Sequence, residues 1–175
     1  MFQVGWLLII LGSQSNLYLL ILPLLVVYLL LERRWHQTNF KQHIARITLA
    51  VSGFVFDSIL EYLDLIHFSS AHNFTGPGLA PLWLFLMWLW FAVTFSTCYR
   101  WMNDRPGLAI TFGFIFGPIA YWGASRLTDV QIINPIAFTL ASAIFWGVLF
   151  AVVFIVHNFR RQLVIVQEKQ TYLTE

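Results

Sequence analysis

Residues 135–157 read PIAFTLASAIFWGVLFAVVFIVH, a stretch without Lys, Arg, Asp or Glu. A helix needs about 20 mainly apolar residues to cross the roughly 30 Å hydrocarbon core of a bilayer. Pro135–His157 therefore predicts a transmembrane helix. The whole chain has the same character: of its 175 residues, 59% are hydrophobic and 10% charged, and the mean hydropathy is +0.73. Soluble domains carry roughly 25% charged residues, so the composition excludes a soluble enzyme.

The composition also excludes other classes of protein. A disordered chain has low hydrophobicity, and a nucleic-acid-binding protein has a dense basic face, whereas the net charge here is only +2. The single cysteine, Cys98, cannot form an intramolecular disulfide or a cysteine-based metal site. We expect one integral membrane domain over residues 1–175, with no cofactor, no metal and no nucleic acid partner.

Further membrane segments precede this span. The N-terminal stretch Phe2–Leu31 is apolar but is interrupted at residues 12–16, GSQSN, by turn and cap formers. We expect a short N-terminal helix that enters the bilayer, then a spanning helix over Asn16–Arg34 with a kink at Pro23. Three later stretches have the length and apolarity of a span or come close to it: Ile47–Ile66, Ala80–Trp101 and Gly107–Ala124. The predicted fold is an all-α transmembrane bundle with five full spans and a short N-terminal membrane helix.

The basic residues predict the orientation, because Lys and Arg near the ends of spans stay in the cytoplasm. If successive loops lie on alternate sides of the membrane, nine Lys and Arg residues lie on one side and one lies on the other. The loop Glu32–Arg46, the turn Arg100–Pro106 and the tail from Asn158 belong to the basic side, whereas His67–Leu79 and Ser125–Asn134 belong to the other. We therefore expect a multi-pass membrane protein with a cytoplasmic C-terminus and a cytoplasmic tail at residues 158–175.

Three acids in the segment 47–66 are the main candidates for a functional site. Asp57, Glu61 and Asp64 lie at i, i+4 and i+7, which places them on one face of a helix. Asp57 would then lie near the middle of the bilayer, where a carboxylate costs at least ~2.5–3.5 kcal/mol on insertion scales. We expect these acids to face the bundle interior or a wet cavity.

The sequence offers few partners for these acids. On the predicted outer side only Arg126 is available, and it would reach Asp64 or Glu61 but not Asp57. We expect Asp57 to be protonated or to form hydrogen bonds with groups such as Ser58, Thr94 or Tyr121. Two interpretations stay open: a proton-handling or headgroup-binding site, and a hydrogen bond that joins helices.

Other residues have simpler interpretations. Asp64, His67 and His72 make a conceivable metal triad, but their spacing is not typical of one, and loop histidines are usually solvated. The deep tryptophans Trp88, Trp90 and Trp146 favour bulky packing or lipid contact over a pocket. In the segment 107–124, the small residues Gly113 and Gly117 before Pro118 favour tight helix packing with a kink over a substrate site in a broken helix.

An ordered set of short motifs resembles a known family. The motifs are Asp57-Ser58-Ile59-Leu60, Pro81-Leu82-Trp83-Leu84, Arg100-Trp101, Gly117-Pro118-Ile119-Ala120-Tyr121-Trp122-Gly123 and Arg126-Leu127. Over nearly the whole chain they resemble an uncharacterised bacterial inner-membrane family, a numbered domain of unknown function. The chain departs from that pattern at Asp64, where the family tends to have Gly, and at Ser96, where Asn is more usual.

The resemblance implies candidate site residues and a cellular context. The positions that match are Asp57, Trp83, Arg100, Pro118, Tyr121 and Arg126. Genes of the family often lie beside lipid-modifying enzymes of the cyclopropane-fatty-acid-synthase type, an association and not a mechanism. It implies membrane lipids, and such enzymes, as partners.

The leading functional prediction is a lipid-handling accessory protein with an intramembrane pocket around Asp57. The alternatives are a small proton-coupled transporter or channel subunit, with Asp57, Glu61 and Asp64 as a relay, and a purely structural membrane subunit. A membrane enzyme that acts alone ranks last, because no spacing in the chain is specific for a reaction.

Overall fold

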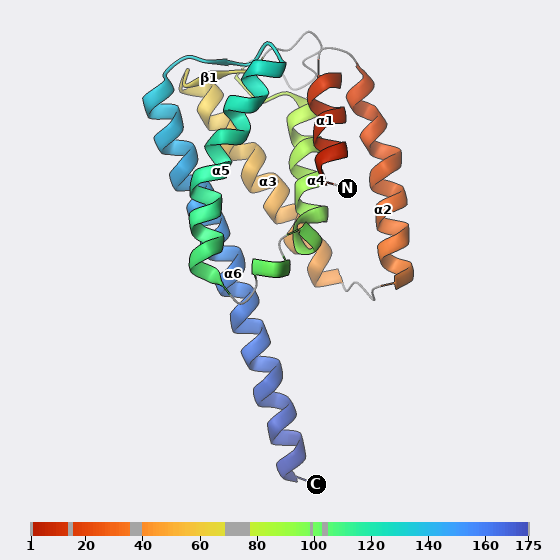
Figure 1. Ribbon diagram of the computed structural model, residues 1–175. Coiled ribbons are helices and arrows are strands. Elements are labelled where there is room, and N and C mark those ends of the chain that lie inside the picture. The colour runs from red at the N-terminus through yellow and green to blue at the C-terminus, as the bar shows by residue number, and fades with distance from the viewer. Residues whose placement is uncertain are drawn as a thin grey trace. The chain divides into compact units, whose positions relative to one another are not determined.

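The computed structural model describes residues 2–13, 16–35, 40–68, 78–98, 100–102 and 105–174 (Figure 1). Within these ranges the fold is all-helical apart from two two-residue strands. The elements are α1 (Phe2–Gly12), η1 (Asn16–Leu20), α2 (Ile21–Trp35), α3 (Phe40–Tyr62), β1 (Ile66–His67), α4 (Leu82–Cys98), η2 (Arg100–Met102), α5 (Pro106–Leu127), β2 (Gln131–Ile132) and α6 (Pro135–Thr174). They form two compact units: Met1–Cys98 with Tyr121–Phe138, and Tyr99–Ala120 with Thr139–Glu175.

Three of the described helices are long and apolar enough to cross a membrane: α3, α5 and residues 135–156 of α6. They correspond to three of the five predicted spans. The other two predicted spans contain shorter apolar helices. Residues 16–34 divide into η1 and α2, and α4 has 17 residues, about 26 Å at 1.5 Å per residue.

The predicted break near the N-terminus is confirmed, because α1 ends at Gly12. A Cβ on Gly12 would lie 2.6 Å from the backbone nitrogen of Tyr18, so the chain passes too close for any other residue. Pro23 lies in the first turn of α2. The N–H groups of a first turn have no intrahelical acceptor, so proline is tolerated there.

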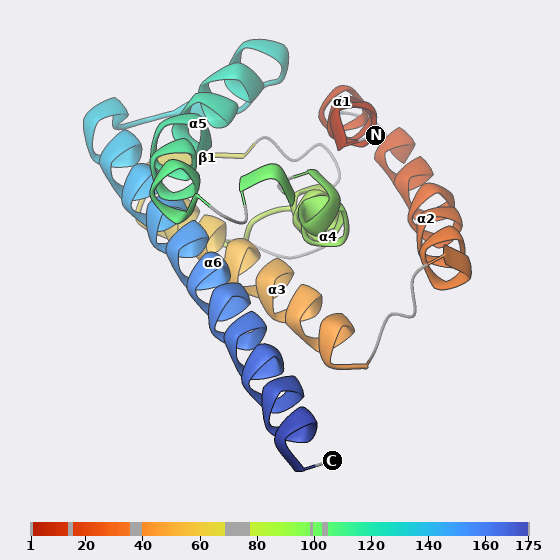
Figure 2. The same cartoon turned by 60° about the horizontal axis from the view of Figure 1, so that its bottom comes forward.

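The first unit is built around α4, which packs against α1 and α3 (Figure 2). Glycines on the two flanking helices admit the large rings of α4. A Cβ on Gly5 would lie 2.2 Å from Nε1 of Trp90, and a Cβ on Gly53 would lie 2.1 Å from the Trp88 ring. Close packing thus accounts for the interior position of two of the three deep tryptophans.

The end of α3 differs from the prediction. The helix ends at Tyr62 rather than continuing to Ile66, and Asp64 has a φ of 52°. Its N–H bonds the carbonyl of Glu61, and the N–H of Leu65 bonds that of Leu60. This pattern is the Schellman motif that closes many helices.

The chain beyond α3 forms a small antiparallel sheet. Ile66 of β1 pairs with Ile132 of β2, and His67 pairs with Gln131. The sheet joins the segment after α3 to the segment after α5. These two loops therefore lie at the same end of the first unit.

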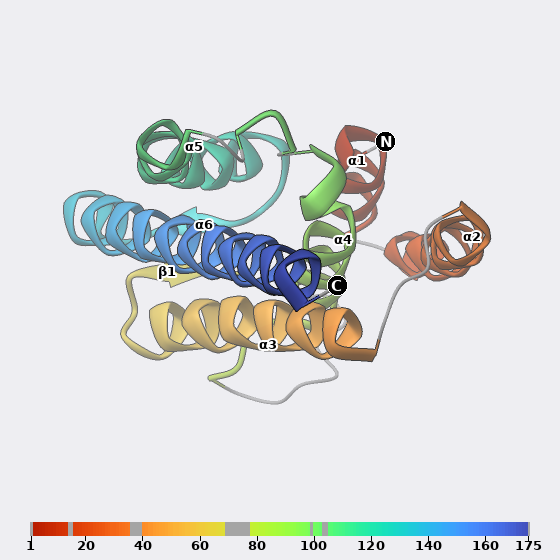
Figure 3. The same ribbon diagram turned by 90° about the horizontal axis from the view of Figure 1, so that it is seen from below.

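In the second unit, α5 packs closely on α6 (Figure 3). A Cβ on Gly117 would lie 2.2 Å from the Trp146 ring, and a Cβ on Gly113 would lie 2.8 Å from the Phe150 ring. The predicted role of these glycines in tight packing is confirmed. Pro118 lies inside α5, which continues through it to Leu127, so a broken helix at this position was a wrong alternative.

Candidate functional site: a carboxyl group shared by three helices

Asp57 is fully buried on α3 and accepts two hydrogen bonds. The indole Nε1 of Trp88, on α4, donates to Oδ2 at 2.6 Å. The hydroxyl of Tyr121, near the end of α5, donates to Oδ1 at 2.5 Å. All three residues belong to the first unit. One carboxyl group therefore connects three helices, and we call these three residues the Asp57 centre.

The surroundings fix each donor in place. Gly53 lies one turn before Asp57 and leaves room for the Trp88 indole. The Phe91 ring packs edge-on against Trp88 with centroids 5.7 Å apart. The Phe138 ring packs in the same way against Tyr121 at 5.4 Å. The two donors are thus held by aromatic packing rather than by flexible polar side chains.

Hydrogen bonding at the centre matches the prediction in part. Tyr121 was one of three predicted partners of Asp57 and is confirmed. Ser58 instead donates to the carbonyl of Phe54 and accepts from the N–H of Ala80, and Thr94 donates to the carbonyl of Trp90. The interpretation of Trp88 as bulky packing is confirmed, but the hydrogen bond from its indole to Asp57 was not predicted. Its indole can lie flat over the bare Gly53 backbone and still present Nε1 to Asp57.

Glu61 belongs to a separate cluster at the end of α3. Its Oε2 accepts the backbone N–H of Phe68 at 2.7 Å, and its Oε1 lies 2.8 Å from Nδ1 of His67. Arg126 is exposed in the last turn of α5 and forms no ion pair with another described residue. The predicted pairing of Arg126 with Glu61 or Asp64 was therefore wrong, because His67 lies closer to Glu61 along the chain.

The sequence predicts that Asp64 shares a helix face with Asp57 and Glu61. The structure differs, because α3 ends at Tyr62, before Asp64. It is exposed and adopts the left-handed conformation of the Schellman motif. Glycine is the usual residue at such a position. Asp64 is therefore set apart from Asp57 and Glu61 by the end of the helix.

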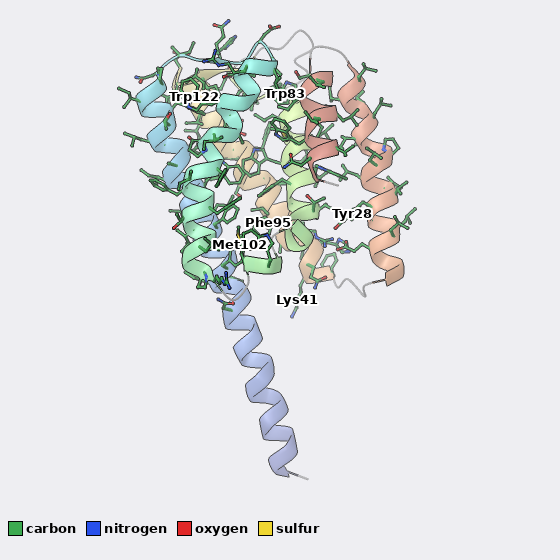
Figure 4. The ribbon with its side chains drawn as sticks, in the orientation of Figure 1. Tyr28, Lys41, Trp83, Phe95, Met102 and Trp122 are labelled. Atoms are coloured by element: carbon green, nitrogen blue, oxygen red, sulfur yellow. The ribbon has the colours of Figure 1, made fainter. Side chains whose placement is uncertain are left out.

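The remaining predicted residues are dispersed. Trp83 lies in the first turn of α4, 4% exposed, with its ring edge-on to Phe68 (Figure 4). Arg100 lies in η2 and Pro118 in α5, both in the second unit. Of the predicted site residues, the structure joins Asp57 and Tyr121 by a side-chain hydrogen bond. His72 lies outside the described residues, among which no group of three or more His, Cys, Asp or Glu side chains could hold a metal.

Sequence reasoning missed an ion pair between α2 and α3. The guanidinium of Arg46 bonds both carboxylate oxygens of Glu32, at 2.6 Å through Nη1 and also through Nη2. Both side chains are nearly buried, at 12% and 11% exposure. The available signal was one Glu and one Arg at the two ends of the same predicted loop.

An all-helical chain with three helices of membrane-spanning length and apolarity, and with a buried carboxyl group that joins its helices, has the features of a polytopic membrane protein. The chain belongs to the family described as "Protein of unknown function (DUF2878)", whose model matches residues 1–152. The resemblance to a numbered family of unknown function is thereby confirmed. No curated protein and no solved structure matches the chain.

Proposed function

We propose that this chain is an integral protein of the bacterial inner membrane that handles lipids as an accessory protein. The proposal rests on the apolar side chains that α3, α5 and α6 leave exposed. In the most apolar windows of α3, α5 and α6, only 28%, 33% and 28% of residues are buried inside the protein. Side chains such as Ile136, Leu140 and Ile144 form an exposed apolar stripe on α6. A surface of this kind contacts acyl chains.

The orientation has its own test. The two loops joined by the β1–β2 sheet carry one Arg between them, whereas the opposite ends are basic, which favours sheet outside and C-terminus inside. In a Cys98→Ser background, a membrane-impermeant thiol reagent should label Leu63→Cys and Asp129→Cys from the periplasm. Lys41→Cys should react only after the inner membrane is opened. Labelling of Lys41→Cys first would reverse the orientation.

Asp57 serves this function by fixing helices. Both of its oxygens accept hydrogen bonds and the residue is fully buried, so a ligand in the predicted pocket would have to displace Trp88 or Tyr121. We assign the centre the task of holding α3, α4 and the end of α5 together. Lipid contact then belongs to surfaces outside the centre.

Lipid mass spectrometry tests the proposal. A deletion strain should have an altered acyl or headgroup profile, which the wild-type gene restores. Asp57→Leu should fail to restore it, because two buried donors lose their acceptor. Asp129→Leu, an exposed matched control, should restore it at equal expression. An unchanged profile in the deletion strain, while the wild-type strain expresses the gene, would exclude lipid handling.

A second candidate is proton handling, favoured by one specific observation. An ionisable group buried in an apolar helix is by default a functional candidate, and Asp57 is such a group. The matching test is proton flux into proteoliposomes. A transporter loses its flux in Asp57→Asn, whereas the lipid-handling protein shows no flux in either form.

A further inference from the structure

At the beginning of α4 the N–H of Leu84 donates to the carbonyl of Pro81, whereas the N–H groups of Leu82 and Trp83 have no acceptor among the described residues. The first N–H groups of any helix lack intrahelical partners, and Pro81, which precedes Leu82, has no side-chain oxygen to cap them. The Nε1 of Trp83 is also buried without a hydrogen-bond partner among the described residues. A long side chain on a helix leans toward the helix N-terminus. The indole N–H of Trp83 and the uncapped backbone N–H groups therefore share one region.

Buried donors without partners are rare in folded proteins, and each one calls for a specific cause such as a bound ligand. The nearby polar groups are already engaged. The N–H of Ala80 donates to Ser58 Oγ, and Glu61 accepts from Phe68 and contacts His67. Among the described residues of this region, the indole N–H of Trp83 is thus left without an acceptor.

Residues 66–68, which we call the strap, bring the Phe68 ring against Trp83. The Phe68 ring is 2% exposed and packs edge-on against Trp83 with centroids 6.1 Å apart. Glu61 holds the strap through the N–H of Phe68 and the imidazole of His67. Pairing of Ile66 with Ile132 holds its other end. The contacts of Glu61 with Phe68 and His67, together with the β1–β2 pairing, therefore hold the strap in place next to Trp83.

We propose that Trp83 and the start of α4 bind an uncharged acceptor oxygen of a membrane lipid, the ester carbonyl of a glycerolipid, when the strap opens. This site rests on the proposed function and names the part of the lipid that is recognised. The donors are neutral, and Leu82 and Trp83 have no Lys or Arg beside them in the chain. The carboxylate of Glu61 next to Phe68 disfavours an anion. A carbonyl oxygen fits both conditions, and tryptophan at the end of a span lies at the depth of lipid esters.

Nuclear magnetic resonance of the indole N–H groups tests this site in the full chain. With ¹⁵N-labelled tryptophan in maltoside micelles, loss of one resonance in Trp83→Phe assigns Trp83. Titration with a diester phosphatidylcholine should shift that resonance saturably downfield. The dialkyl ether analogue, which has the same headgroup and no carbonyl, should not shift it. Trp101, which is 59% exposed, serves as an internal control.

Two variants test the strap. Glu61→Ala removes its anchor and should lower the half-saturating concentration of the ester lipid several-fold. Asp64→Ala, in the adjacent turn, should leave that concentration unchanged. An equal shift with the ether lipid, equal shifts at Trp83 and Trp101, or no shift at all would overturn the proposal. Since the cellular lipid profile is measured separately, failure of this site is distinguishable from failure of lipid handling.

Discussion

The Trp88 indole occupies the space that a side chain at Gly53 would take: a Cβ there would lie 2.1 Å from the ring. From this position its Nε1 reaches Asp57, one helical turn further along α3. The five residues 53–57 of one helix thus provide both the recess for the ring and the acceptor for its polar atom. The Asp57 centre therefore depends on glycine at position 53, because even the methyl group of alanine would overlap the Trp88 ring.

Gly53→Ala should therefore displace Trp88 and weaken its bond to Asp57. Overpacking of an interior costs about 1–3 kcal/mol, and we expect a loss of this size in the free energy of unfolding in micelles. Gly123→Ala is the matched control, because a Cβ there meets nothing within 4 Å. Equal stability of the two variants would show that the ring has room to move.

Asp57→Asn should be mild and Asp57→Leu severe. An amide oxygen can still accept from Trp88, and its NH₂ can donate to the Tyr121 hydroxyl, which accepts as well as donates. Leucine offers no acceptor, and each buried donor left unpaired costs about 1–3 kcal/mol. Unfolding by denaturant compares the two variants, and a loss as large for Asn as for Leu would contradict this geometry.

Tyr121→Phe removes one of the two donors to Asp57 and keeps the ring that packs on Phe138. The expected loss in unfolding free energy is about 1–3 kcal/mol, in the range for hydrogen bonds to acidic groups. Tyr62→Phe provides the control, because Tyr62 is 77% exposed and should change stability by less than about 0.5 kcal/mol. No difference between these variants would mean that the Tyr121 hydroxyl contributes nothing.

Asp64→Gly should raise stability by up to about 1 kcal/mol, because glycine adopts a positive φ without steric cost. Asp64→Val should lower it, since a β-branched residue is strained there. Thermal unfolding of both variants checks the sign. Stabilisation by valine would exclude the left-handed conformation at this position.

Arg46→Gln leaves the nearly buried carboxylate of Glu32 without its partner, and loss of one member of a buried pair costs about 3–5 kcal/mol. The double variant Arg46→Gln/Glu32→Gln should recover part of that loss, because no unpaired charge remains. A double-mutant cycle in unfolding free energy measures the coupling. Strict additivity would show that the pair does not interact.

The sequence predicts the fold where apolar length decides it. Residues 47–66, 107–124 and 135–157 each contain most of a membrane-length helix, because a long run of mainly apolar residues leaves few alternatives. The end of α3 could not be predicted in this way. Apolar residues recur as far as Ile66, and the end of the helix depends on backbone hydrogen bonds and on the φ of Asp64, which apolar periodicity does not record.

For the candidate site, too, the sequence predicts some of the residues and contacts but not others. Asp57 stands out because a carboxyl group in an apolar segment is costly, and Tyr121 was one of the three polar partners that the sequence offered for it. The packing of Trp88 could be predicted, but its bond to Asp57 could not, because an indole is both a bulky ring and a donor and the fold uses both properties. The partner of Glu61 depends on a chain reversal that brings His67 back to α3.

The Asp57 centre also sets an order for biogenesis. Trp88 follows Asp57 by 31 residues and Tyr121 follows it by 64. At roughly 5–20 residues per second, ribosomes need about 3–13 s to make the second donor after Asp57. During that interval the acid has at most the α4 indole as its partner. A nascent chain stalled before Tyr121 is therefore the species for which the insertion machinery must shield an incompletely bonded carboxyl group from lipid.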